Sequence, residues 1–279
     1  MNIAGHDVGV CSWCIPCQGM QDLCQKVKQL GLAHLQLGLG PELFLDDKRK
    51  HQELGALRAS GLTLTAGMIG FPGEDYSSIG IIRKTGGFVP DEQWPLRKQL
   101  AIHAGKLAAE LKLDKLTTHI GFIPHSNEDR YAAMIGRVRE VAAPLAEVGV
   151  NLLMETGQEA APELLQFLND LGTKNVFVNF DPANMILYGA GDPIEAIGIL
   201  GRHIRHVHVK DAILSEQPGT KWGEEVPFGK GQVNPGEFLH ALKRVEYDGP
   251  LVIERELGEN GAADVATAIE SLRRAAETL

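Results

Sequence analysis

The segment "RHIRHVHVKD" (residues 202–211) places three histidines, a lysine and an aspartate among apolar residues. Successive side chains of a β-strand point to opposite faces. His206, His208 and Lys210 are therefore predicted to share one face, with the two intervening valines on the other. Titratable side chains in an otherwise buried strand raise the question of which of them carry chemistry.

Similar apolar runs recur along the chain, separated by longer amphipathic segments. The expected strands are "VGVCSW" (8–13), "HLQLGL" (34–39), "LTLTAGMI" (62–69), "KLTTHIGF" (115–122), "VNLLMET" (150–156), "NVFVNFD" (175–181), "IRHVHVKD" (204–211) and "PLVIERE" (250–256). Expected helices include residues 20–31, 48–61, 92–113, 130–149 and 262–279, where apolar residues recur at steps of three and four.

Eight strand–helix units in 279 residues predict an α/β fold, a (β/α)8 TIM barrel that forms a single domain over residues 1–279. The alternative is an open, doubly wound sheet. That fold usually has fewer strands and a phosphate-binding glycine turn after the first one, and "CSWCIPCQGM" (11–20) is not such a turn.

Composition and charge limit the classes of partner. With 44% hydrophobic and 23% charged residues, the chain can build a large core. A net charge of −9 argues against nucleic acid, because proteins that bind phosphate backbones usually carry a basic face. The start of the chain lacks the pattern of a signal peptide, and no segment approaches the ~20 apolar residues of a membrane helix. We therefore expect a cytoplasmic protein that binds neither nucleic acid nor membranes.

Polar residues occur late in five successive expected strands, where a barrel places its chemistry. They are His119, Glu155, Asp181, His208 and Glu254. Each acid could instead cap the following helix or pair with a lysine, but several at the same end are hard to explain as independent caps. Converging carboxylates repel one another unless a cation lies among them. Two glutamates, an aspartate and a histidine suit Mn, Mg, Co or Zn.

Five motifs occur in an order that resembles the xylose isomerase-like TIM-barrel superfamily, which includes the sugar phosphate isomerase/epimerase family. They are "LLMETG" (152–157), "VNFDPAN" (178–184), "HVHVKD" (206–211), "VPFGKGQVN" (226–234) and "LVIERE" (251–256). The resemblance covers nearly the whole chain. It implies one divalent metal ion, with Mn foremost and Mg, Co or Zn as alternatives. The implied ligands are Glu155, Asp181, His208 and Glu254.

The resemblance also implies an activity, that of an isomerase or epimerase of a sugar, sugar phosphate, inosose or small hydroxy-carbonyl compound. Glu155 and Glu254 would act as acid and base, passing a proton through an enediolate that the metal stabilises. A metal-dependent dehydratase or lyase acting on a keto-sugar or inosose is the alternative, since both reactions begin with loss of a C–H proton. A sugar-binding protein without activity would not need two such glutamates. The family further implies a homo-oligomer, a dimer or tetramer.

Five residues are candidates for binding the carbohydrate-like substrate: His119, Asn184, Lys210, Trp13 and Trp222. Each has a structural alternative, such as a core histidine, a helix cap, an ion pair or a loop anchor. His206 is expected to be a buried histidine bonded to a neighbour. Asp211 is expected either to orient His208 or to shape the following loop.

Two further activities are weighed against this one. Apurinic endonucleases of the same superfamily use three zinc ions and extra histidines, but Asn184 replaces one of these histidines, and residues 222–231 lack the expected Asp-x-His pair. Cys11, Cys14 and Cys17 have a C-x-x-C-x-x-C spacing that could hold an iron–sulfur cluster. Radical S-adenosylmethionine barrels use C-x-x-x-C-x-x-C instead. The alternative for these cysteines, and for Cys24, is packing.

Overall fold

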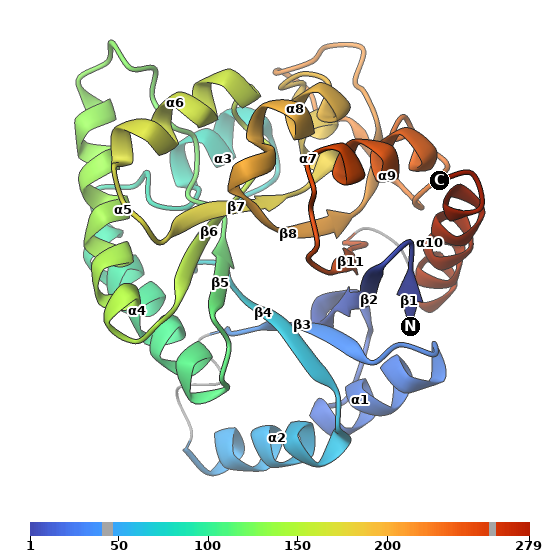
Figure 1. Cartoon of the computed structure of the whole chain (residues 1–279). Coiled ribbons are helices and arrows are strands. Elements are labelled where there is room, and N and C mark those ends of the chain that lie inside the picture. The colour runs from blue at the N-terminus through green and yellow to red at the C-terminus, as the bar shows by residue number, and fades with distance from the viewer. Residues whose placement is uncertain (41–46, 257–260) are drawn as a thin grey trace.

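The computed structural model describes residues 1–40, 47–256 and 261–279. Within these residues, eight parallel strands close into a barrel, and β11 completes it by pairing with β2 (Figure 1). The barrel strands are β2 (His6–Cys11), β3 (His34–Gly38), β4 (Thr63–Ile69), β5 (Lys115–Thr118), β6 (Asn151–Glu155), β7 (Val176–Phe180), β8 (Ile204–Val209) and β11 (Leu251–Ile253). The predicted (β/α)8 TIM barrel is confirmed.

Helices surround the barrel on its outer side (Figure 1). They are α1 (Met20–Gln29), α2 (Asp47–Ser60), α3 (Ile79–Thr85), α4 (Trp94–Glu110), α5 (Arg130–Glu147), α6 (Ala161–Leu171), α7 (Pro182–Tyr188), α8 (Pro193–Leu200), α9 (Pro235–Arg244) and α10 (Gly261–Ala276). In α6, for example, Leu164, Phe167 and Leu171 are buried at helical spacing, and Gly172 ends the helix in the left-handed conformation at φ 59°. Among the described residues, no helix is long and apolar enough to span a membrane.

The strands end slightly earlier than the sequence indicates. β5 ends at Thr118, β7 at Phe180 and β11 at Ile253, so His119, Asp181 and Glu254 each follow a strand. The reason is clearest at Asp181, whose Oδ1 accepts a hydrogen bond from the backbone N–H of Asn184 at 2.8 Å and so begins α7. The polar residues therefore lie at the start of the loops, where the barrel opens.

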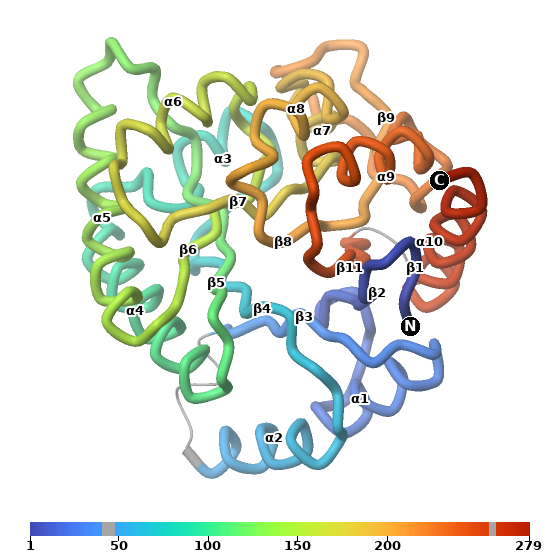
Figure 2. The backbone as a smooth tube through the Cα atoms, viewed as in Figure 1, coloured from blue at the N-terminus to red at the C-terminus, as the bar shows by residue number. Residues whose placement is uncertain are grey.

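Two short elements extend the barrel. β1 (Asn2–Ile3) pairs antiparallel with β2, and Figure 2 shows it beside α10, with both chain ends on the same side of the molecule. β9 (Asp211–Ile213) and β10 (Glu224–Val226) form an antiparallel ribbon that follows β8. This ribbon carries the long β8–α9 connection past the open end of the barrel.

The Asp211 carboxylate holds the last part of that connection. It accepts hydrogen bonds of 2.8–2.9 Å from the backbone N–H groups of Gly229, Gly231 and Val233. A Cβ on Gly231 would lie 2.4 Å from Asp211 Oδ1, so the loop can close around the carboxylate only with glycine there. Asp211 thus shapes the loop, which is one of its two predicted roles.

Candidate metal centre and active site

Four buried side chains converge at the open end of the barrel. Glu155, Asp181, His208 and Glu254 are each no more than 4% exposed. The Nδ1 atom of His208 faces all three carboxylates, at 3.3 Å from Glu155 Oε1, 3.4 Å from Asp181 Oδ2 and 3.2 Å from Glu254 Oε2. The residues that the sequence indicates as ligands are therefore together in space.

The arrangement fits one divalent metal ion. One ligand atom from each of the four residues lies within 4.8 Å of all the others. Donors around an ion with bonds of about 2.1 Å are themselves roughly 3–4 Å apart, so a small contraction brings the set to bonding distance. Three carboxylates and one imidazole form a mixed oxygen and nitrogen set, which suits the ions predicted from the sequence.

The charges of the four residues depend on one another. Burial alone would lower the pKa of His208, but the Glu254 and Glu155 carboxylates outweigh it and raise this pKa well above its usual value. Burial would raise the pKa of Glu254, but His208 and Lys210 hold it well below its usual value. Burial raises the pKa of Asp181 to about 6. The three carboxylates thus favour positive charge near His208 Nδ1, which a metal cation can supply.

A chain of hydrogen bonds connects the two glutamates. Lys210 Nζ donates to Glu254 Oε2 at 2.9 Å and to Asn184 Oδ1 at 3.2 Å. Asn184 Nδ2 in turn donates to Glu155 Oε1 at 2.9 Å. Asn184 and Lys210, both expected to bind substrate, therefore contact the expected acid and base directly.

Lys210 is also surrounded by acids that the sequence analysis did not select. Its Nζ lies 3.4 Å from a carboxylate oxygen of Glu256 and 3.8 Å from one of Glu225. Glu256 lies two residues after Glu254 in "VIERE", so the sequence could have indicated it as a second acid on the same side of the strand. Glu225 comes from β10 and had no comparable signal. The ion-pair alternative for Lys210 is thus present in the structure.

Two more of the expected residues contact the glutamates. Trp13 lies in a short 3-10 turn after β2 and donates its Nε1–H to Glu254 Oε1 at 2.9 Å. His119 Nε2 lies 3.7 Å from Glu155 Oε2, close enough to interact electrostatically. Each glutamate therefore has one oxygen in the ligand cluster and the other near an aromatic residue.

Trp222 lies in a different environment. Its Nε1–H donates to the backbone oxygen of Tyr76 at 3.0 Å, and its ring packs edge-on against Tyr188 with 4.6 Å between centroids. These contacts anchor the loop before β10, which is the structural alternative considered for this residue. Tyr76 in turn packs edge-on against His119, at 6.5 Å, so the anchored loop lies close to the site.

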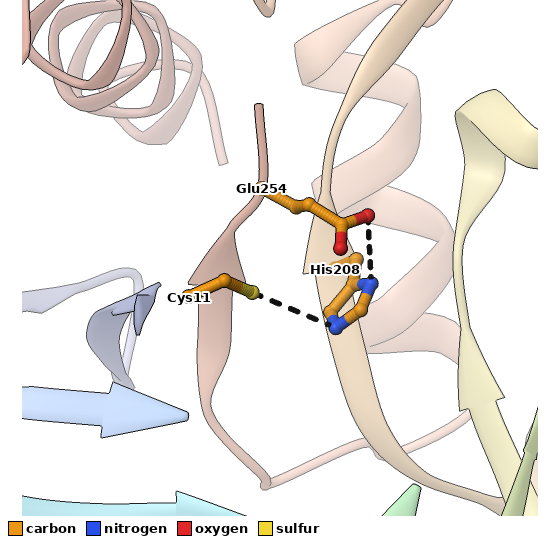
Figure 3. A group of neighbouring side chains, drawn as sticks. All are labelled: Cys11, His208 and Glu254. Atoms are coloured by element: carbon orange, nitrogen blue, oxygen red, sulfur yellow. Dashed lines mark hydrogen bonds and ion pairs between the residues drawn. The ribbon is translucent and has the colours of Figure 1, made fainter. Parts of the chain in front are cut away.

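The far side of the His208 ring contacts Gln36, which the sequence analysis missed. His208 Nε2 lies 2.7 Å from Gln36 Oε1, and Cys11 Sγ lies 3.8 Å from the same nitrogen. Figure 3 shows Glu254 directed at one ring nitrogen of His208 and Cys11 at the other. Asp211, which was considered as the residue that orients His208, bonds its own loop instead.

His206 is fully buried, as expected. Its Nδ1 is 2.8 Å from Asn179 Oδ1, and its Nε2 is 3.1 Å from Thr65 Oγ1. Both ring nitrogens therefore have partners within the barrel, which is the structural role predicted for this histidine.

The cysteines do not gather into a cluster. Cys11, Cys14 and Cys24 are buried, whereas Cys17 is exposed. In the part of the chain that the structure describes, no group of three or more potential metal ligands contains more than one cysteine. This arrangement favours packing over an iron–sulfur cluster. Cys14 Sγ, for instance, donates to the backbone oxygen of Ile253 at the end of β11 and accepts a hydrogen bond from the backbone N–H of Arg255.

Comparison with known proteins defines the class to which this fold and site belong. The model of the xylose isomerase-like TIM barrel family matches residues 24–275, and the chain belongs to that family. A solved xylose isomerase domain protein from Planctomyces limnophilus is 31% identical, with a TM-score of 0.89 over 98% of this chain and 99% of that one. A solved L-ribulose 3-epimerase shares the fold at 18% identity, with a TM-score of 0.71 over 97% and 94% of the two chains.

The chain spans about half the length of the curated relatives that it matches. One is an inosose dehydratase from Clostridium botulinum, 23% identical over 147 residues, which are 47% of this chain and 49% of the relative. Similar proteins thus include an epimerase and a dehydratase.

Proposed function

We propose that this protein is a divalent-metal-dependent isomerase or epimerase of a sugar, sugar phosphate, inosose or small hydroxy-carbonyl compound. The observation that carries the proposal is the placement of Glu155 and Glu254. Each directs one carboxylate oxygen at His208 Nδ1, within 3.3 Å, while the other oxygen lies outside the cluster. Two carboxylates arranged around one cation site can serve as ligands and as proton acceptor and donor.

Glu155, Asp181, His208 and Glu254 would hold the metal ion, and Mn is the ion we propose first. When bound, a divalent cation would stabilise the negative charge that develops on a hydroxy-carbonyl substrate as its C–H proton leaves. The tight spacing of the four donors, all within 4.8 Å, supports this assignment.

The residues around the ligands would divide the remaining work. One of Glu155 and Glu254 would remove a proton from the substrate carbon, and the other would return one. Lys210 and Asn184 connect the two glutamates and would fix their positions, while remaining near enough to contact a substrate oxygen. His119, Trp13 and Trp222 would complete the substrate-binding surface.

A dehydratase or lyase of a keto-sugar or inosose is the second candidate. The similarity to an inosose dehydratase favours it. The same glutamates would then remove the C–H proton and protonate a departing hydroxyl group, so the two candidates differ in the fate of the neighbouring oxygen.

A deuterium-exchange experiment tests the proposal. The protein would first be analysed for bound metal and then, with Mn²⁺ present, incubated in D₂O with ketoses, aldoses, inososes and their phosphates. Isomerisation or epimerisation would appear in NMR spectra as a new isomer deuterated at the reacting carbon. Dehydration would instead give an unsaturated or deoxy-carbonyl product. A protein that binds no divalent metal, or a metal-loaded protein that exchanges no substrate proton, would contradict the proposal.

Paired variants separate catalysis from binding. Glu155→Gln should abolish the exchange, whereas Glu163→Gln, which changes a half-exposed glutamate in α6, should not. If Glu155→Gln merely weakened sugar binding, a binding protein would be the better description.

We also propose that residues 1–279 act as one domain and that the protein is a cytoplasmic dimer or tetramer. Light scattering of the purified protein measures its oligomeric state.

A further inference from the structure

We propose that Gln36 of β3 is a positioning residue that holds the His208 ring with Nδ1 directed at the three carboxylates. This inference rests on the proposed metal site and concerns how the histidine ligand is oriented. Gln36 is fully buried inside the barrel, and its amide oxygen contacts Nε2 of the ring, whereas the three carboxylates face Nδ1. It therefore contacts the ligand without contacting the metal position.

The orientation of the Gln36 amide follows from its neighbours. Thr117 Oγ1 lies 3.1 Å from the backbone oxygen of Gly67, and a carbonyl oxygen can only accept, so the hydroxyl can donate its proton there. Gln36 Nε2 lies 2.8 Å from the same hydroxyl and donates to it. The amide nitrogen is thereby directed at Thr117, which leaves the amide oxygen directed at His208.

The amide oxygen then determines which ring nitrogen of His208 carries the proton. Gln36 Oε1 has no proton to give, so at 2.7 Å it requires an N–H at His208 Nε2. With that proton fixed at Nε2, the lone pair of a neutral ring is at Nδ1, which faces the carboxylates. A histidine ligand held through its second nitrogen is a common device in metal sites, and its loss weakens metal binding.

Two other groups are near His208 Nε2, and each has another acceptor to which it can donate. Asn179 Nδ2 lies 3.2 Å away, but its amide is oriented by His206 at 2.8 Å and its N–H can donate to Glu155 Oε2 at 3.3 Å. Cys11 Sγ donates to Gln36 Oε1 at 3.3 Å and so also holds that oxygen in place. The shortest contact at Nε2 is the one with Gln36.

The test compares Gln36→Met, which keeps the length of the side chain but has no carbonyl oxygen, with wild type. Thr65→Val is the matched control, because it removes a buried partner of His206 on the neighbouring strand. Mn²⁺ affinity would be measured by competition with a chelator. The His208 Nε2 proton would be followed by NMR in the protein labelled with ¹⁵N-histidine and loaded with diamagnetic Zn²⁺.

We expect Gln36→Met to weaken Mn²⁺ binding by about 10–100-fold and the His208 Nε2 proton to shift and exchange faster. Thr65→Val should change neither quantity. Gln36→Glu, which retains an acceptor oxygen, should keep the slowly exchanging Nε2 proton. If Gln36→Met does not fold, Thr117→Val provides the same test, because it frees the amide and should produce a smaller loss in the same direction.

The outcomes separate this inference from the proposed function. If wild type binds Mn²⁺ and the variants at positions 36 and 117 bind it equally well with an unchanged Nε2 proton, the positioning role of Gln36 is overturned and the metal site stands. If wild type binds no divalent metal, the proposed function fails, and the role of Gln36 fails with it.

Discussion

Lys210 and Glu254 form an ion pair inside the protein, with Nζ 2.9 Å from Oε2 and both side chains only 1% exposed. The same Nζ lies 3.4–3.9 Å from carboxylate oxygens of Glu256, Glu225 and Asp181. One lysine thus shares its charge among four acids. Burying charged groups is costly unless the charges are balanced. Here four carboxylates share one lysine, and this excess of negative charge determines how the site should respond to substitution.

Lys210→Gln should make stability depend more strongly on metal. Removing one partner of a buried ion pair typically costs 3–5 kcal/mol, and Mn²⁺ should offset part of that loss because it supplies positive charge to the same carboxylates. The free energy of unfolding would be measured with Mn²⁺ and with a chelator. Lys98→Gln, which breaks the exposed pair with Glu140, should cost less than about 1 kcal/mol in both conditions. An equal loss for Lys210→Gln with and without Mn²⁺ would contradict this account.

Trp13→Phe should reduce catalysis more than metal binding. The substitution keeps an aromatic ring but removes the Nε1–H that donates to Glu254 Oε1. A hydrogen bond to a charged group contributes about 1.5–3 kcal/mol, so the rate of solvent-deuterium exchange should fall by roughly tenfold or more. Trp94→Phe is the control. It changes a tryptophan at the start of α4 that packs against Phe88, and it should leave the rate unchanged. Equal rates for the two variants would show that the Glu254 contact has no catalytic role.

Asp211→Asn should loosen a loop and leave metal affinity intact. The carboxylate accepts backbone N–H groups from residues 229, 231 and 233 and from Ala212, and an amide can replace only part of these bonds. We expect a loss of about 1–3 kcal/mol and faster amide hydrogen exchange at Gly229, Gly231 and Val233. Asp192→Asn, at the N-cap of α8, gives a comparison for a local helix cap. A large loss of Mn²⁺ affinity in Asp211→Asn would instead mean that Asp211 orients His208.

Glu159 should make the folded state less stable as pH rises. Burial raises the pKa of this carboxyl from 4.5 to about 8, while its Oε1 accepts a hydrogen bond from the backbone N–H of Ile123. Between these two pH values the unfolded chain releases the proton and the folded chain retains it, so stability falls with increasing pH.

Glu159→Gln removes this dependence. Its stability relative to wild type should increase from near zero at pH 4.5 to a few kcal/mol at pH 8, since each pKa unit corresponds to about 1.4 kcal/mol. Urea unfolding at pH 5, 6.5 and 8 measures the trend. Glu147→Gln, at an exposed position at the end of α5, should show no such trend. A difference that is constant across pH would mean that Glu159 is already ionised in the folded protein.

The barrel and its four convergent residues could be predicted because the signals are local. The last five barrel strands are short apolar runs with a polar residue at or just after the end, and a closed parallel barrel brings all such ends to one place. Glu155 and Asp181 illustrate this, since adjacent strands β6 and β7 place them together without any further information.

The surrounding contacts could not be predicted because they depend on how side chains meet across the barrel. Gln36 reaches His208 from a strand 172 residues earlier in the chain, and a buried glutamine in an apolar run carries no signal of its partner. Glu225 reaches Lys210 only because the β9–β10 ribbon folds back. For Asp211 the sequence allowed two roles, and the glycines that surround its carboxylate decided between them.

Asp181 uses one carboxylate oxygen to begin α7 and directs the other at His208. A shift of this carboxylate should therefore also shift the start of α7, which ends seven residues later at Tyr188. Tyr188 packs against Trp222, with 4.6 Å between ring centroids. We therefore expect the fluorescence of Trp222, which packs against one end of this short helix, to change when a metal ion binds the carboxylate at the other end.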